Sequence, residues 1–158
     1  MSARFESQKH RRRSIRVPEY DYTRSGAYYI TIVTSQRKCL FGDVINDEMH
    51  LNELGHIARV EWFRTAILRP YVELFEDEFV VMPNHVHGII WIFDDVVGAR
   101  RRRPPTNENN IEKFGNPIPG SIPTIIRAYK SAVTYAVNVL QNQRGAALWP
   151  RNYYEHII

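Results

Sequence analysis

The order of apolar and polar residues along the chain predicts four main strands. Residues 27–34 (AYYITIVT) alternate between two faces and are dense in β-branched and aromatic residues, which indicates a strand. Residues 80–82 and 85–93 form two more apolar runs, and Pro83-Asn84 between them predicts a tight turn. Residues 148–158 close the chain with another strand-like run. The pattern therefore contains a hairpin with a polar turn at its tip.

Two further segments have helical spacing. Apolar residues recur every three or four positions from Asn52, a candidate N-cap, until Arg69-Pro70 stops the helix. A second helix begins at Ser121 and ends near Gln143–Gly145. Residues 39–51 alternate around Asn46-Asp47, which predicts a small hairpin. The second helix has a continuous apolar stripe, made of Ile122, Ile125, Ile126, Tyr129, Ala132, Val133, Ala136, Val137 and Leu140.

Taken in order, these elements give the β-α-β-β-α-β arrangement of an α+β, ferredoxin-like sandwich, with an antiparallel sheet and both helices on one face. The other face would be left for a ligand. We expect residues 1–26 to be a basic arm and residues 27–158 to be the domain, with a flexible loop at 98–120 that is rich in arginine, proline and asparagine.

Composition supports one soluble domain. The chain has 158 residues, of which 44% are hydrophobic and 24% charged. It contains no run of about 20 apolar residues that could span a membrane and no secretory signal, so we expect a cytoplasmic protein. Cys39 is the only cysteine, which excludes an internal disulfide and a cysteine-based zinc site.

The net charge of +4 is unevenly distributed. Residues 1–24 carry seven Lys or Arg against three acidic residues, and a second basic run follows at 100–103. Such segments suit a polyanion, with nucleic acid as the first candidate, although solvated tails would have the same composition. The candidate DNA-binding residues are Arg11, Arg12, Arg13, Arg16, Arg100, Arg101, Arg102, Arg103, Arg127 and Lys130.

His85 and His87 are the strongest chemical signal. Alternate residues of a strand share one face, so both imidazoles can present a nitrogen to the same divalent ion. The alternative is that one histidine caps the turn and the other packs on the sheet. A third ligand would have to come from elsewhere in the fold, and the candidates by residue type are His156, Glu155, Asn84 and the acidic bend at 76–78.

The nine tyrosines are potential nucleophiles, because a phenol can attack a phosphodiester. For each of them a packing role is the simpler hypothesis. Tyr129 lies in the apolar stripe, whereas Tyr135 lies outside it and is predicted to be more exposed. Tyr153 and Tyr154 should point to opposite faces of the last strand, so that one of them is buried.

The segment Met82-Pro-Asn-His-Val-His-Gly-Ile-Ile-Trp resembles the signature of the HUH single-tyrosine transposases, the insertion-sequence and REP-associated family. The likeness continues over nearly the whole chain. It includes Arg11-Arg-Arg-Ser-Ile-Arg, Tyr20-Asp-Tyr, Gly26-Ala-Tyr-Tyr-Ile-Thr, Leu51-Asn-Glu-Leu-Gly, Ile126-Arg-Ala-Tyr-Lys-Ser-Ala-Val-Thr and Leu148-Trp-Pro-Arg-Asn-Tyr-Tyr-Glu-His-Ile-Ile.

This resemblance implies a ferredoxin-like catalytic domain in which His85 and His87 hold Mg2+ or Mn2+ at the scissile phosphate. It implies cleavage and rejoining of single-stranded DNA that carries palindromic hairpins, through a 5′-phosphotyrosine intermediate. The arginines of the arm and the loop would contact phosphates. We expect a bacterial, nucleoid-associated protein that is a monomer or a homodimer and does not bind membranes.

In the family, the strand resembling residues 153–158 is followed by a helix with a Tyr-Ile-x-x-Asn-Pro motif, which supplies the nucleophile and a further metal ligand. We therefore expect the nucleophilic tyrosine beyond Ile158. The alternative expectation is a truncated, non-catalytic relative that binds DNA. A small metal-dependent hydrolase is disfavoured, because the chain offers neither an adjacent set of carboxylate ligands nor an oxyanion motif.

Overall fold

The computed structural model describes residues 16–93 and 118–158. Most of the predicted basic arm and most of the predicted loop at 98–120 therefore lie outside the described residues. Short 3-10 turns at Ser35–Arg37 and Glu76–Glu78 connect longer elements. The strands and helices follow the order β1 (Gly26–Val33), β2 (Gly42–Ile45), β3 (Glu48–Leu51), α1 (Glu53–Leu68), β4 (Val72–Glu73), β5 (Phe79–Met82), β6 (His85–Ile92), α2 (Ile122–Leu140) and β7 (Tyr154–Ile157).

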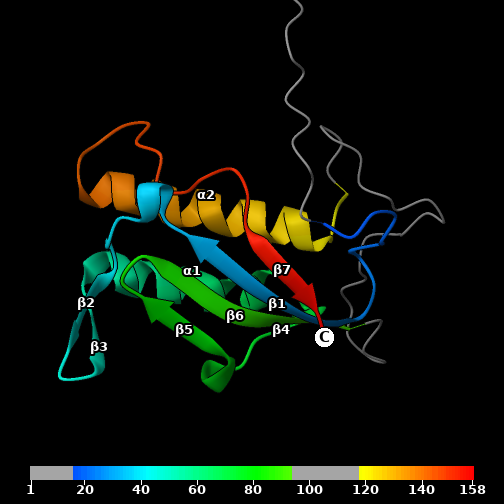
Figure 1. Cartoon of the computed structure of the whole chain (residues 1–158). Coiled ribbons are helices and arrows are strands. Elements are labelled where there is room, and N and C mark those ends of the chain that lie inside the picture. The colour runs from blue at the N-terminus through cyan, green and yellow to red at the C-terminus, as the bar shows by residue number, and fades with distance from the viewer. Residues whose placement is uncertain (1–15, 94–117) are drawn as a thin grey trace, which may run out of the picture.

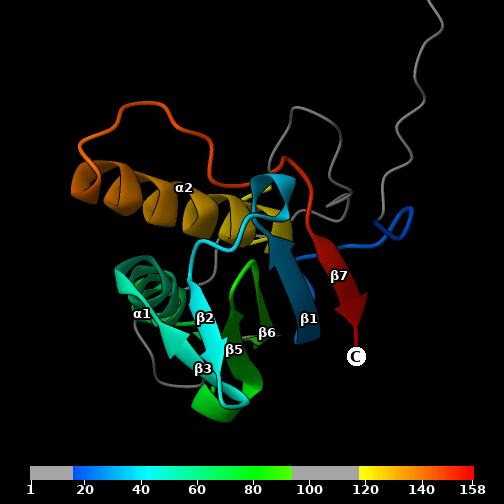
Figure 2. The same cartoon turned by 60° about the vertical axis from the view of Figure 1, so that its left-hand side comes forward.

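The main sheet has β1 and β6 at its centre and is antiparallel throughout (Figure 1). β7 pairs with the free side of β1. β5 and β4 share the other side of β6, where β5 pairs along residues 85–88 and β4 along residues 91–92. This arrangement confirms the predicted α+β fold with the ferredoxin-like strand order. The β2–β3 hairpin forms a separate two-stranded sheet beside it (Figure 2).

Local sequence signals mark where the elements begin. The Asn52 side chain accepts a hydrogen bond from the Gly55 amide at 3.0 Å, as predicted for the N-cap of α1. Ser121 does the same for α2 through the Thr124 amide at 3.3 Å. Asn46 and Asp47 both adopt positive φ, 51° and 64°, in the tight turn of the predicted small hairpin.

Three boundaries differ from the predictions. β4 was not predicted, because two residues are too few to show alternation. α2 ends at Leu140, a few residues before the predicted stop. The last strand covers only Tyr154–Ile157, since the carbonyls of residues 150–152 accept hydrogen bonds from Lys130 and do not enter the sheet ladder.

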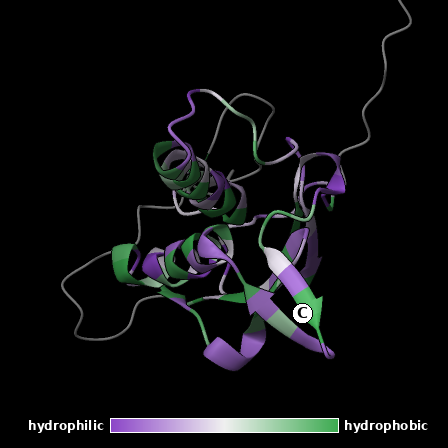
Figure 3. Ribbon diagram, turned by 90° about the vertical axis from the view of Figure 1, so that its left-hand side faces the viewer, coloured by the Kyte–Doolittle hydropathy of each residue, from purple (hydrophilic) through white to green (hydrophobic). Residues whose placement is uncertain are grey.

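The core lies between the sheet and the two helices, which form a second layer (Figure 3). On β6 the inward positions Val86, Ile90 and Ile92 are all buried. Gly88 occupies the remaining inward position, where the Trp62 indole of α1 covers it so closely that a Cβ there would lie 2.4 Å from the ring. Neither helix in the described parts of the chain is long and apolar enough to cross a lipid bilayer.

Candidate functional site

The two histidines of the predicted metal pair lie side by side on the sheet face opposite the helices. β6 directs Val86 into the core, so His85 and His87 project from the other face. Their ring centroids are 4.4 Å apart and the ring planes are inclined by 77°. The tight turn at Pro83-Asn84 places this pair at the start of β6. The pairing of β6 with β1 and β5 keeps the backbone beneath them rigid.

A hydrogen bond orients the His85 ring. Its Nδ1 lies 2.6 Å from the Asn84 side-chain oxygen, which can only accept, so Nδ1 carries the proton. The amide nitrogen of Asn84 donates to the Arg37 carbonyl at 3.3 Å, which agrees with this orientation of the side chain. The unprotonated nitrogen of His85 is therefore Nε2, the atom that can bind a cation.

His87 is held in a comparable way from β1. Its Nδ1 lies 2.8 Å from the Thr31 hydroxyl, and Thr31 is its direct partner in the β1–β6 ladder. The Tyr29 ring stacks on the imidazole at 5.7 Å with an interplanar angle of 20°. Hydrogen bonds of this kind at Nδ1 fix imidazoles that bind metals through Nε2. The pair therefore offers a divalent ion Nε2 of His85 and, in the tautomer in which Nδ1 donates to the Thr31 hydroxyl, Nε2 of His87.

The protonation state of both rings favours metal binding. Partial burial lowers the pKa of His85 below its ordinary value of 6.5. Burial also lowers the pKa of His87, and the nearby His85 adds to that effect. Both imidazoles are consequently neutral at pH 7, which is the form that coordinates metals.

The four predicted sources of a third ligand lie in different places. Within residues 16–93 and 118–158, no three His, Cys, Asp or Glu side chains cluster closely enough to hold an ion. His156 shares the open face but pairs with Tyr29, so β1 separates it from β6. Glu155 points to the helical side, where both carboxylate oxygens are buried. Asn84 is already bonded to His85, as described above.

The acidic bend, the fourth candidate, lies at the other end of β6. The Glu78 carboxylate accepts a 2.6 Å hydrogen bond from the Trp91 indole. Trp91 is four residues beyond His87, about 13 Å along a strand. Glu78 is thus positioned beside an aromatic cluster and not beside the imidazole pair.

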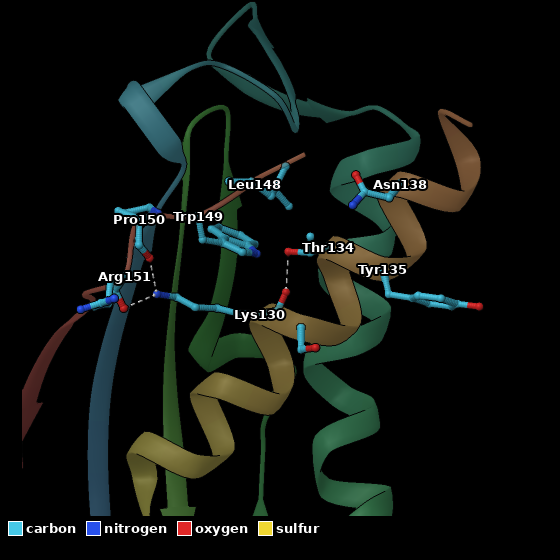
Figure 4. Close-up of a pocket in the computed structure, with 10 residues that line it drawn as sticks. Lys130, Thr134, Tyr135, Asn138, Leu148, Trp149, Pro150 and Arg151 are labelled. Atoms are coloured by element: carbon cyan, nitrogen blue, oxygen red, sulfur yellow. Dashed lines mark hydrogen bonds between the residues drawn. The ribbon is translucent and has the colours of Figure 1, made fainter. Parts of the chain in front are cut away.

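Three members of the predicted DNA-binding set, Arg16, Arg127 and Lys130, lie in the described part of the chain. The Arg16 guanidinium lies 5.8 Å from the centre of the Tyr153 ring, and Arg127 is exposed on α2. The Lys130 ammonium donates to the carbonyls of Pro150 and Arg151 at 2.9 and 3.3 Å (Figure 4), and also to that of Asn152 at 3.0 Å. Burial lowers the pKa of Lys130 to about 8. The other predicted arginines, at 11–13 and 100–103, lie outside the described residues.

A groove of about 420 Å³ lies next to Lys130, between α2 and residues 147–151 (Figure 4). Thr134 and Asn138 form its helical wall, and Leu148 and Trp149 form the other. Because α2 covers the inner face of the sheet, this groove does not adjoin His85 and His87. The imidazole pair lies on an open surface instead.

The tyrosines are distributed as predicted. Tyr129 is buried and donates to the Ala58 carbonyl at 3.1 Å, and Tyr135 is 73% exposed. Tyr153 is buried, whereas Tyr154 on the opposite face is 52% exposed. Tyr129 and Tyr153 therefore have packing roles, and Tyr154 shares the open face with the two histidines.

Sequence reasoning missed Tyr29 and Thr31 as parts of the site. Alternation within residues 27–34 places both on one face, but only the register between β1 and β6 shows that this face contains His87. That register is a long-range feature, because more than fifty residues separate Thr31 from His87.

Comparison with known proteins adds a relative and a shared fold. No protein-family model matches the sequence. An uncharacterized protein of Haemophilus influenzae (strain ATCC 51907 / DSM 11121 / KW20 / Rd) is 38% identical over 158 residues, which cover 100% of this chain and 84% of the relative.

The solved structure of a REP-associated tyrosine transposase bound to a REP hairpin is similar with a TM-score of 0.51 and 18% identity. The alignment covers 90% of this chain and 61% of the transposase chain, so this chain spans about three fifths of that protein's length. At this identity the likeness establishes the fold. That fold agrees with the one implied by the family resemblance in the sequence.

Proposed function

Because this chain belongs to the same family as the Haemophilus influenzae protein and has the fold of the REP-associated tyrosine transposase, we propose that it is an HUH transposase domain that acts on single-stranded DNA. The observation that carries the proposal is the imidazole pair on the open sheet face, with ring centroids 4.4 Å apart and each Nδ1 engaged in a hydrogen bond. The REP hairpin bound to the structural neighbour supports DNA as the substrate class.

In this proposal His85 and His87 hold Mg2+ or Mn2+, which supplies positive charge at a phosphate oxygen of the scissile group. The role of this chain's residues is to keep both imidazoles neutral and correctly oriented. Asn84 and Thr31 orient the rings through the two Nδ1 atoms, and partial burial favours their neutral form. Tyr29 limits rotation of the His87 ring by stacking on it.

The reaction we propose is transfer of a DNA phosphoryl group to a tyrosine. A phenol oxygen forms a bond to phosphorus and loses its proton, the bond from phosphorus to the 3′ oxygen breaks, and that oxygen takes up a proton. The products are a 5′-phosphotyrosine link and a free 3′-hydroxyl. Reversal with another 3′-hydroxyl rejoins the strand. We propose that the tyrosine follows β7, as the family resemblance implies, and that the protein works at the bacterial nucleoid.

The test uses the protein as its gene encodes it, incubated with hairpin-forming single-stranded DNA and Mn2+. We expect a covalent protein–DNA adduct that survives denaturing electrophoresis. His85→Ala combined with His87→Ala should abolish the adduct, whereas His56→Ala, an exposed histidine on α1, should not change it. DNA binding without any adduct would refute catalysis and leave the non-catalytic DNA-binding alternative.

A further inference from the structure

The open face of the sheet is divided into two chemically different halves. One half, over β1 and β7, presents Tyr29, Thr31, Tyr154 and His156 beside the imidazole pair. The other half, at the far end of β6, presents Trp91, which contacts Phe75 and Phe93 at 6.5 and 6.4 Å between ring centres. Both halves contain exposed aromatic rings, so exposure alone does not show which one a ligand uses.

Charge distinguishes the two halves. The aromatic cluster at Trp91 is bordered by carboxylates: Glu73 pairs with Trp91 in the β4–β6 ladder, and Glu78 bonds its indole. Asp77 precedes Glu78 in the same bend, as does Glu76, whose carboxylate pairs with Arg59 at 3.4 Å. By contrast, the open-face positions of β1 and β7 carry no carboxylate in the described part of the chain, since Glu155 points inward. A polyanion is therefore repelled by the half that contains Trp91 and tolerated by the half over β1 and β7.

The geometry of the half over β1 and β7 suits nucleobases. Thr31 has His87 as its partner on one side and Tyr154 on the other, so the two backbones flanking β1 lie about 10 Å apart. Tyr154 is 52% exposed and Tyr29 is 38% exposed, which leaves ring surface available for stacking. Bases of single strands stack on such rings with little dependence on sequence.

We propose that the single strand leaves the imidazole pair across β1 and β7, with unpaired bases stacked on Tyr154 and Tyr29, and avoids the Trp91 cluster. This inference rests on the proposed function and adds the path of the DNA to it. Tyr154 and Tyr29 are then binding residues that hold the strand in register with the metal pair.

The experiment measures binding of single-stranded oligothymidylate by fluorescence anisotropy at low salt, without divalent metal. Tyr154→Ala should weaken binding about 5- to 100-fold, and Tyr154→Phe should bind like the unaltered protein because the ring is retained. Phe75→Ala is the matched control: this ring is 41% exposed on the acidic half, and its removal should leave affinity unchanged. An abasic strand of equal length should bind the unaltered protein and Tyr154→Ala equally weakly.

Other outcomes overturn the inference in distinguishable ways. If Phe75→Ala weakens binding and Tyr154→Ala does not, the path is wrong although the protein binds DNA. If Tyr154→Ala reduces affinity for normal and abasic strands by the same factor, its ring does not stack on bases. A change in sedimentation without a change in DNA binding would show that Tyr154 contacts a second copy of the chain. If the unaltered protein binds neither hairpin nor single-stranded DNA, the proposed function fails as well.

Discussion

Gly88→Ala tests whether the glycine after the second histidine is required by packing. A Cβ at this position would lie 2.4 Å from Cζ2 of Trp62 and 2.8 Å from Cδ2 of Phe79. Carbon atoms in contact prefer about 3.5–4.0 Å, so the methyl group must displace the indole by roughly 1 Å. Trp62 cannot move freely, because it stacks on Phe79 at 4.6 Å and meets the edge of Tyr129 at 5.3 Å between ring centres.

The size of the destabilisation by Gly88→Ala follows from the enclosure of Trp62, which is only 2% exposed. Overpacking a core in this way costs about 1–3 kcal/mol, and the rigid surroundings favour the upper end. For a domain of this size, about 3 kcal/mol corresponds to a fall in Tm of roughly 6–12 °C. Thermal unfolding followed by circular dichroism measures this directly. We also expect weaker Mn2+ binding, because strain at residue 88 is transmitted to His87.

Introducing Gly88→Ala into a Trp62→Phe variant separates the cost of the clash with the indole from any intrinsic cost of alanine in the strand. Trp62→Phe removes the atom nearest to the added methyl group. In that background Gly88→Ala should cost at least about 1 kcal/mol less than in the unaltered protein, because the two contacts with the indole are lost while the one with Phe79, at 2.8 Å, remains. An equal cost in both backgrounds would refute the packing explanation.

Three further predictions concern the site and its support. Thr31→Val should reduce Mn2+ affinity, measured by calorimetry, about 10- to 100-fold, because it removes the hydroxyl that bonds His87. Thr31→Ser keeps that hydroxyl and should bind Mn2+ like the unaltered protein. Equal losses in both variants would contradict this role. Because the pKa values of His85 and His87 are lowered in the folded state, the unfolded chain takes up protons first as pH falls below about 6.5. The free energy of unfolding should therefore fall on acidification below that pH. Mn2+ affinity should fall once the pH reaches the depressed pKa values. In urea titrations the double variant His85→Ala, His87→Ala should lose the pH dependence of its unfolding free energy. Lys130→Met should destabilise the protein by about 2 kcal/mol and increase amide exchange in β7, because three carbonyls lose their donor; unchanged exchange at residues 154–157 would show that β7 is held by other contacts.

Local patterns were sufficient for much of the architecture. Asn52 and Ser121 start their helices through their own side chains, and Asn46-Asp47 turns its hairpin through its own backbone angles. Alternation alone indicated that His85 and His87 share a face and that Tyr153 and Tyr154 do not. These features depend on residues a few positions apart, so physical chemistry at short range determines them.

The composition of the candidate site depended on the tertiary structure. The sequence determined that two imidazoles could act together, but the register of β1 against β6 decided that Thr31 and Tyr29 hold His87. The order of strands decided that β1 separates His156 from the pair and that Glu155 points inward. The same order put the carboxylates at one end of the open face and the exposed tyrosine at the other. Such long-range pairings follow from burial of the whole apolar face against both helices, which no short segment encodes by itself.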